Sequence, residues 1–181
     1  GVDYPSKVTS LAGRMHYDGQ DDWECYDTQN VSVEFPENKM ITWEGVSCVS
    51  FKTCGTSRGV MICGSKGRIE YTSGYKVYDL GNQLLREEKT VSKKTDLTNT
   101  ADPGLNDRHA ENFVDSILGQ DTINSPMTEA HKSVLLGHLG NIAVRTGTTI
   151  NCNTKTGRII GNRDAKKLWS RKYESGWKPK V

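Results

Sequence analysis

The sequence changes its hydrophobic period once, and this change constrains the fold more than any other feature. Up to about residue 86, apolar and polar residues alternate, as in residues 30–35, and turn sequences such as residues 64–67 separate the runs. Alternation with period two is typical of strands that have one buried face. Beyond residue 106, the apolar positions recur every three or four residues, which is typical of helices. This order predicts the α+β class, with a mostly antiparallel open sheet that meanders along the chain and helices packed on one face.

The strand pattern is clearest where β-branched residues alternate with polar ones. The strands are expected at residues 7–12, 30–35, 40–51 with a break near Gly45, 60–63, 68–71, 75–79 and 84–85, with a short one at 148–152. In residues 30–35, Ser32 and Glu34 point away from Val31 and Val33, so the second face of the sheet is partly polar. A sheet covered on one side often presents its other face to a partner, and we therefore expect a homo-oligomer through this face.

Three helices are expected after the sheet. Asp107 is expected to cap the first, which ends near Gly119. The second covers residues 128–145, with Thr128 and Glu129 expected to cap its start and Gly147 just past its end. The third begins at Asn162 or Asp164 and runs through Tyr173. Residues 87–105 contain almost no apolar groups and are expected to form a mobile connection.

Composition limits the function classes. A chain of 181 residues with 34% hydrophobic content can bury one core, so we expect a single domain over residues 1–181. A net charge of +2 does not indicate a nucleic-acid partner. No apolar run approaches the roughly 20 residues of a membrane span, and no secretion signal opens the sequence, which favours the cytoplasm. The five cysteines are odd in number and form no C-x-x-C pair, which favours a reducing compartment over a disulfide framework or a zinc site.

No complete active site is found by pattern alone. His131 and His138 are seven residues apart without a carboxylate to complete a metal site. The acidic cluster at residues 18–27 lacks the residue order of a calcium loop. The glycines of residues 55–59 and 64–67 fit hairpin turns and not a phosphate-binding loop. No catalytic, cofactor-binding or metal-binding residue is therefore assigned.

Taken in order, several segments resemble the C-terminal domain of the glucose–fructose oxidoreductase/inositol dehydrogenase family (Gfo/Idh/MocA), in its Bacteroidetes-like branch. The matching segments are residues 3–8, 13–14, 33–35, 42–45, 64–67, 75–79, 109–113, 131–133, 139–147 and 164–173, with Trp177 close behind. The resemblance implies an N-terminal Rossmann domain that binds NAD or NADP, and a second domain that completes the substrate pocket and often mediates dimers. This chain has no counterpart of the dinucleotide fingerprint or of the catalytic lysine and histidine motifs.

The expected function is therefore that of a substrate-binding and oligomerisation domain. The parent protein would be an NAD(P)-dependent oxidoreductase acting on sugars, polyols or their derivatives, and the isolated chain is not expected to be catalytically competent or to bind the cofactor. The expected partners are the sugar or polyol, the missing Rossmann domain and a second copy, with no nucleic acid and no membrane. An export signal on the missing part would change the location. Two alternatives remain: a stand-alone carbohydrate- or protein-interaction module, and part of a glycoside-cleaving enzyme that uses NAD.

Substrate contacts are expected from polar and aromatic residues on loops. In the segment after the first strand these are Arg14, His16, Tyr17 and Trp23, whose side chains suit sugar hydroxyls and a pyranose ring. His109 and Asn112 lie three residues apart near a helix start and are expected to point the same way. The alternative is structural: the aromatic residues pack the loop, and the pair on the helix caps it.

Overall fold

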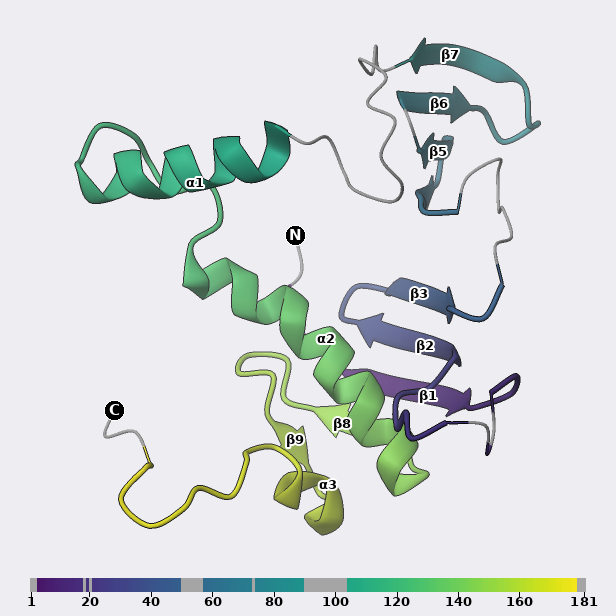
Figure 1. Ribbon diagram of the computed structural model, residues 1–181. Coiled ribbons are helices and arrows are strands. Elements are labelled where there is room, and N and C mark those ends of the chain that lie inside the picture. Colours follow the sequence, from purple (N-terminus) through teal and green to yellow (C-terminus); the bar gives the residue numbers. More distant parts are fainter. Residues whose placement is uncertain are drawn as a thin grey trace. The chain divides into compact units, whose positions relative to one another are not determined.

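The computed structural model describes residues 3–17, 19, 21–49, 57–72, 74–89 and 104–178 (Figure 1). The chain divides into two compact units, of which the first holds residues 1–48 and 125–181 and the second holds residues 49–124. Each unit has its own antiparallel sheet and at least one helix. The predicted α+β class is confirmed, but the strands are divided between two sheets and do not form the one meandering sheet that the sequence pattern predicted.

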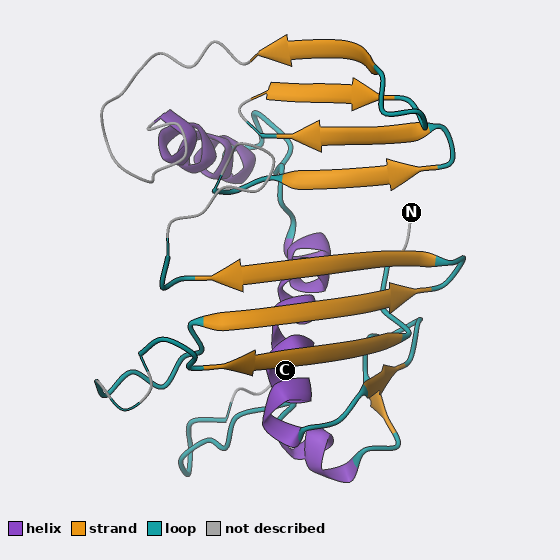
Figure 2. Cartoon of the chain, turned by 90° about the vertical axis from the view of Figure 1, so that its right-hand side faces the viewer, coloured by secondary structure: helices purple, strands orange, loops and turns teal. Residues whose placement is uncertain are grey.

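The first unit is built on a five-stranded sheet in the order β3-β2-β1-β8-β9. Its elements are β1 (Lys7–Gly13), β2 (Thr28–Phe35), β3 (Lys39–Val46), α2 (Met127–Thr146), β8 (Ile150–Cys152), β9 (Ile159–Ile160) and α3 (Arg163–Lys167). Figure 2 shows α2 behind the three long strands, on one face of the sheet. The predictions for β1, β2 and β8 are close to the observed bounds. The prediction at residues 40–51 is wrong in two respects, because β3 continues through Gly45 without a break and ends at Val46; residues 50 and 51 lie outside the described ranges. The strand β9, only two residues long, was not predicted.

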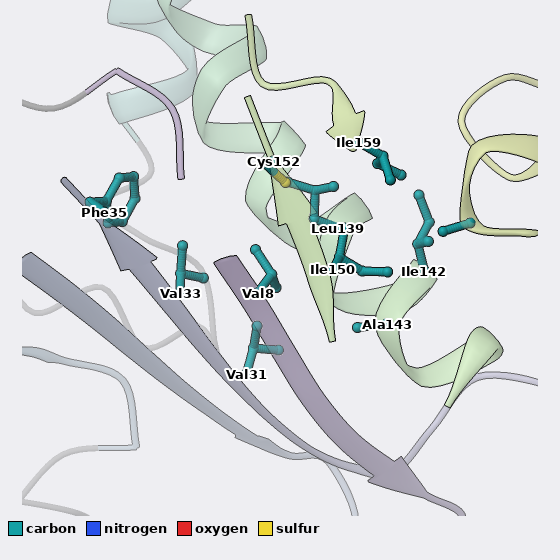
Figure 3. Packing of buried hydrophobic residues seen from close by; sticks show 11 residues of the cluster. Val8, Val31, Val33, Phe35, Leu139, Ile142, Ala143, Ile150, Cys152 and Ile159 are labelled. Atoms are coloured by element: carbon teal, nitrogen blue, oxygen red, sulfur yellow. The ribbon is translucent and has the colours of Figure 1, made fainter. Parts of the chain in front are cut away.

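The core of this unit lies between the sheet and α2 (Figure 3). Alternate residues of β2, namely Val31, Val33 and Phe35, are buried, as the period-two pattern requires. Leu139 and Ile142 of α2 meet them from the other side. The remaining buried members of the cluster are Val8, Ala143, Ile150, Cys152, Ile159 and Ala165. One apolar layer thus joins all the elements of the unit except the exposed strand β3, whose side chains stay outside it.

The C-terminal end of α2 has the predicted glycine cap, whereas its N-terminal end lacks the predicted side-chain cap. Gly147 adopts the left-handed conformation at φ 59°, and the N–H of Thr148 donates to the carbonyl of Ala143 at 3.2 Å. At the other end the N-cap position is Pro126, without a side-chain cap, so the predicted capping by Thr128 is wrong. Glu129 instead accepts a hydrogen bond from Lys132 at 2.8 Å. The helix start is stabilised by backbone geometry and tertiary packing and does not use a capping side chain.

The third helix is shorter than predicted. Asn162 caps it, because its side chain accepts from the N–H of Ala165 at 2.9 Å, but the helix ends at Lys167 and does not reach Tyr173. Trp169 packs against the core, whereas Tyr173 and Trp177 are exposed. Helices of this length depend on packing of an apolar face. Trp169, Tyr173 and Trp177 are spaced four residues apart, but only Trp169 packs against the core. The helix therefore does not continue beyond Lys167.

The N-terminal segment is fastened to α2. The hydroxyl of Tyr4 lies 2.8 Å from Nε2 of His131, and Nζ of Lys132 lies 2.9 Å from Oδ1 of Asp3. Pro5, the residue after Tyr4, is fully buried. Ser6 continues into the sheet, where its N–H donates to Glu34 at 2.8 Å and its carbonyl accepts from Cys152 at 2.9 Å. The segment is therefore an integral part of the first unit.

The second unit contains a four-stranded sheet in the order β4-β5-β6-β7 and one helix. The strands are β4 (Val60–Gly64), β5 (Gly67–Tyr71), β6 (Gly74–Tyr78) and β7 (Leu84–Lys89), and the helix is α1 (Gly104–Ile117). Asp107 lies in the first turn and is not the cap, because the helix begins three residues earlier than predicted. Its apolar side chains Phe113, Val114 and Ile117 are more than half exposed, so the predicted packing of this helix on a sheet face is not observed. Most of the connection predicted at residues 87–105 lies outside the described residues; its first three residues belong to β7.

Two further observations bear on the sequence-based expectations. No helix in the described ranges is long and apolar enough to cross a membrane. Cys25, Cys48, Cys63 and Cys152 are free thiols. Burial raises the pKa of Cys152 to about 11, so this thiol behaves as a small apolar core residue.

Two glycines of α2 give opposite predictions for the same substitution. A Cβ at Gly137 would meet nothing within 4 Å, so Gly137→Ala should raise the free energy of unfolding by about 1 kcal/mol through helix propensity. A Cβ at Gly140 would lie 3.1 Å from both methyl groups of Val31, so Gly140→Ala should lower stability despite the same gain in propensity. Urea unfolding of the two variants measures the difference. Equal stabilisation by both substitutions would show that α2 does not approach β2 closely at Gly140.

Candidate functional site

A cavity of about 230 Å³ lies in the first unit, at the long connection between β1 and β2. This connection, residues 14–27, projects from the ends of the two strands (Figure 2). Three of the predicted site residues, Arg14, Tyr17 and Trp23, line the cavity together. The other lining residues are Asp21, Cys25, Asp27 and Ser47. His16 belongs to the same connection but does not line the cavity; its ring packs edge-on against that of Tyr17, with 4.5 Å between the centroids.

A buried carboxylate holds the connection in place. Asp27, only 5% exposed, accepts hydrogen bonds from three successive backbone N–H groups, those of Met15, His16 and Tyr17, at 3.0, 2.9 and 3.2 Å. The hydroxyl of Thr28 donates to the same carboxylate at 2.8 Å. Burial alone would raise the pKa of Asp27, but these four donors outweigh it and hold the pKa well below its usual range. The ionised side chain therefore acts as the anchor of the loop.

Arg14 and Asp21 form the polar wall of the cavity. One guanidinium nitrogen of Arg14, Nη2, donates to Oδ1 of Asp21 at 2.6 Å and to the carbonyl of Tyr17 at 2.7 Å. Oδ1 of Asp21 also accepts from the N–H of Trp23 at 2.8 Å. The N–H of Trp23 and the Arg14 guanidinium hold the pKa of Asp21 below its usual value. Oδ2 of Asp21 makes no hydrogen bond within the described residues, which leaves an ionised acceptor at the cavity.

One further nitrogen of the Arg14 guanidinium is unusual. Nε of Arg14 is buried and has no hydrogen-bond partner among the described residues. Buried donors without a partner are rare in folded proteins. Arg14 thus retains an unused donor, and Asp21 beside it an unused acceptor oxygen, within the described residues. Hydroxyl groups can both donate and accept.

Aromatic surface completes the cavity. Trp23 is 68% exposed and Tyr17 is 39% exposed, and both line the cavity. Aromatic faces beside charged hydrogen-bonding groups are the residue types that suit a polyhydroxylated ring. In the described ranges, no group of three His, Cys, Asp or Glu side chains is placed to hold a metal ion.

The two predicted site residues on α1 have different surroundings. Asn112 is buried, and its amide is fully used: Nδ2 donates to Asp121 and to the carbonyl of Thr122, each at 3.0 Å, and Oδ1 accepts from the N–H of Asn124 at 2.9 Å. This side chain ties the turn after α1 to the helix. His109 is exposed on the same helix. Both belong to the second unit, whereas Arg14, His16, Tyr17 and Trp23 belong to the first.

Residue types on a loop identified Arg14, Tyr17 and Trp23, but four cavity residues, Asp21, Cys25, Asp27 and Ser47, were not predicted as site residues. Asp27 was recognised only as one of several loop acids, because its role depends on backbone donors that the folded loop brings to it. Ser47 comes from the end of β3, and its N–H donates to the carbonyl of Asp27 at 2.8 Å. The antiparallel register of β2 and β3 places these residues side by side, and that register could have indicated Ser47.

Comparisons with known proteins give a consistent fold. No family model and no curated protein sequence matches the chain. Among solved structures, an oxidoreductase from Agrobacterium radiobacter in complex with NAD+, L-tartaric acid and magnesium matches 82% of the chain at 11% identity, with a TM-score of 0.58. The aldose–aldose oxidoreductase from Caulobacter crescentus, complexed with glycerol, also matches 82%, at 14% identity and a TM-score of 0.57.

A third structure, the WlbA dehydrogenase from Chromobacterium violaceum in complex with NADH and UDP-GlcNAcA, matches 83% of the chain at 16% identity, with a TM-score of 0.52. The chain spans 43%, 42% and 41% of these three proteins, less than half of each. The likeness is one of fold: the chain has the fold of the C-terminal domain of Gfo/Idh/MocA-type oxidoreductases, as its sequence resemblance predicts.

Proposed function

We propose that the chain is the substrate-binding part of an NAD(P)-dependent oxidoreductase that acts on sugars, polyols or their derivatives. The observation that carries the proposal is the match of four fifths of the chain to less than half of such oxidoreductases. The cofactor-binding part then belongs to a Rossmann domain elsewhere in the parent protein. In the described part of this chain both sheets are antiparallel, which does not fit the parallel sheet and glycine-rich turn of a dinucleotide site.

The cavity at residues 14–27 supports a hydroxylated substrate. The exposed indole of Trp23 offers a flat apolar face for a sugar ring, and the free carboxylate oxygen of Asp21 accepts a hydrogen bond from a hydroxyl. Arg14, held by Asp21 and Tyr17, supplies positive charge and a donor at the same wall. These side chains bind and orient the substrate, while hydride transfer takes place on the cofactor of the other domain.

Calorimetric titration tests whether the cofactor binds to the other domain and not to this chain. The parent protein should bind NADH or NADPH, and the 181-residue chain alone should not, because the cofactor site lies on the other domain. Micromolar binding of NADH by the chain alone would contradict the proposal. So would a parent protein without a Rossmann domain, which would favour a stand-alone interaction module.

Kinetics of the parent protein test the cavity. Trp23→Ala should raise KM for the sugar or polyol roughly threefold to tenfold and leave the melting temperature nearly unchanged, because the side chain is mostly exposed. Trp177→Ala is the matched control, since Trp177 is 79% exposed in the same unit and does not line this cavity. Equal effects of the two substitutions, or a loss of melting temperature large enough to explain the change, would show that Trp23 is structural.

A further inference from the structure

A second and larger cavity lies on the outer side of α2, within the first unit and away from the residues of the first cavity. Its volume is about 590 Å³, inside the range of about 300–1,000 Å³ that is typical of small-molecule sites. One stripe of α2 forms one wall, and the β8–β9 hairpin and the segment after α3 form the other. Of these elements, β8 contacts α2, as does α3, which precedes the C-terminal segment (Figure 1).

Three side chains of this cavity have hydrogen-bond donors that the described residues do not use. Arg145 and His138 project from α2 and Arg171 from the C-terminal segment, and none of the three makes an ion pair or hydrogen bond within the described residues. The guanidinium of Arg171 lies 5.2 Å from the ring centroid of Tyr173. Asn141 lies between the two α2 residues; its Oδ1 accepts from Nε2 of Gln29 at 3.3 Å, which leaves its Nδ2 donors free. His131, at the other end of the lining, is already used, since its Nε2 lies 2.8 Å from the hydroxyl of Tyr4. No aspartate or glutamate is found among the described residues that line the cavity.

The rest of the wall is apolar. Leu135 and Trp169 pack against the core with one side and line the cavity with the other. Two guanidinium groups on separate elements, with an imidazole and an amide nearby, provide more donors than a carboxylate with two oxygens can use. A phosphate group has three terminal oxygens and pairs well with guanidinium forks. The indole and leucine beside it suit an apolar or ring-shaped body.

From this arrangement we infer that the outer cavity of α2 binds a phosphate monoester carried on a ring. The site is independent of the proposed substrate cavity, because the two share no lining residue. The phosphate contacts Arg145 and Arg171, the imidazole of His138 and the amide of Asn141 add donors, and the ring lies against Trp169.

Calorimetric titration of the chain with four simple probes separates the contributions. Phenyl phosphate carries both the anion and the ring, inorganic phosphate the anion alone, benzyl alcohol the ring alone, and benzoate a ring with a carboxylate. Phenyl phosphate should bind roughly tenfold more tightly than inorganic phosphate, because the ring buries apolar surface. It should also bind more tightly than benzoate and benzyl alcohol.

Charge variants test the assignment of the anion contacts. Arg145→Gln and Arg171→Gln should each weaken phenyl phosphate binding roughly tenfold. Arg163→Gln removes the same charge from an exposed position of the same unit outside the cavity and should leave the affinity nearly unchanged. All three variants should keep the circular dichroism spectrum of the wild type.

Four results would overturn the inference. These are no binding of phenyl phosphate, equal affinity for inorganic phosphate, tighter binding of benzoate, and an equal loss in Arg163→Gln. The last would show that the anion responds only to the general positive charge of the C-terminal region. None of these results bears on the titration with NADH, which tests the other domain, or on the Trp23 kinetics, which test the other cavity.

Discussion

Leu139→Ala should lower the free energy of unfolding of the first unit by about 2–5 kcal/mol, the range for leucine truncation in a packed core. Leu139 is fully buried between α2 and the sheet. Removing three carbon atoms there leaves a cavity that β-strands and a helix cannot close without moving together. Because small domains are stable by only about 5–15 kcal/mol, a loss of this size should be visible as a large fall in the midpoint of urea unfolding.

The control for this variant is Leu11→Ala. Leu11 lies on β1 in the same unit but is 76% exposed, so the same truncation should change stability by no more than about 0.5 kcal/mol. Similar losses in both variants would mean that α2 is not packed on the sheet as described.

Asp27→Asn should loosen the connection between β1 and β2 and lower the melting temperature at neutral pH. The carboxylate receives four donors, shared between its two oxygens. An amide keeps one acceptor oxygen and turns an NH₂ group toward the others, so buried N–H groups lose their partner. Hydrogen exchange of Met15, His16 and Tyr17 should become much faster, and the affinity of the cavity for substrate should fall with it.

The pH dependence of stability provides a second test of Asp27. Its pKa is lower in the folded than in the unfolded state, so its contribution is fully present above the unfolded value of about 3.9 and is lost as pH falls below it toward the folded pKa. The wild type should therefore lose stability below about pH 4, and Asp27→Asn should lose less over the same interval. Asp22→Asn, a neutralisation of an exposed acid in the same loop, should follow the wild type. Identical pH profiles for all three proteins would contradict the anchoring role of Asp27.

Single strands were predictable because the alternation of apolar and polar residues along a short segment determines which side chains can be buried. In β2 the alternation of Val31, Ser32, Val33 and Glu34 leaves one way to bury the apolar side chains, and the observed bounds are close to the prediction. The length of α3 was not predictable in the same way, because apolar spacing does not tell which residues find a core to pack against. The division into two sheets was not predictable, because the consecutive strands β3 and β4 belong to different sheets and no local pattern distinguishes them from a pair in one sheet.

The candidate site was partly predictable for a similar reason. Arg14, Tyr17 and Trp23 were identified from residue type and from their place on a long connection. The role of Asp27 arises from three consecutive backbone N–H groups that only the closed loop presents, and the amide of Asn112 is used within its own unit, which spacing along a helix could not indicate. Side-chain chemistry can be read from a sequence, whereas hydrogen bonds to distant backbone appear only in the fold.

The attachment of Tyr4 and Asp3 to α2 has a kinetic consequence for a two-domain parent. If the Rossmann domain of the parent protein precedes this segment, the bonds of Tyr4 and Asp3 to His131 and Lys132 fix the point at which the connection between the domains leaves the first unit. Association of the two domains would then be an intramolecular step at an effective concentration set by that connection. Contacts too weak to hold two separate proteins together would then be sufficient to keep the two domains associated during turnover. The same domains expressed as separate chains should associate poorly.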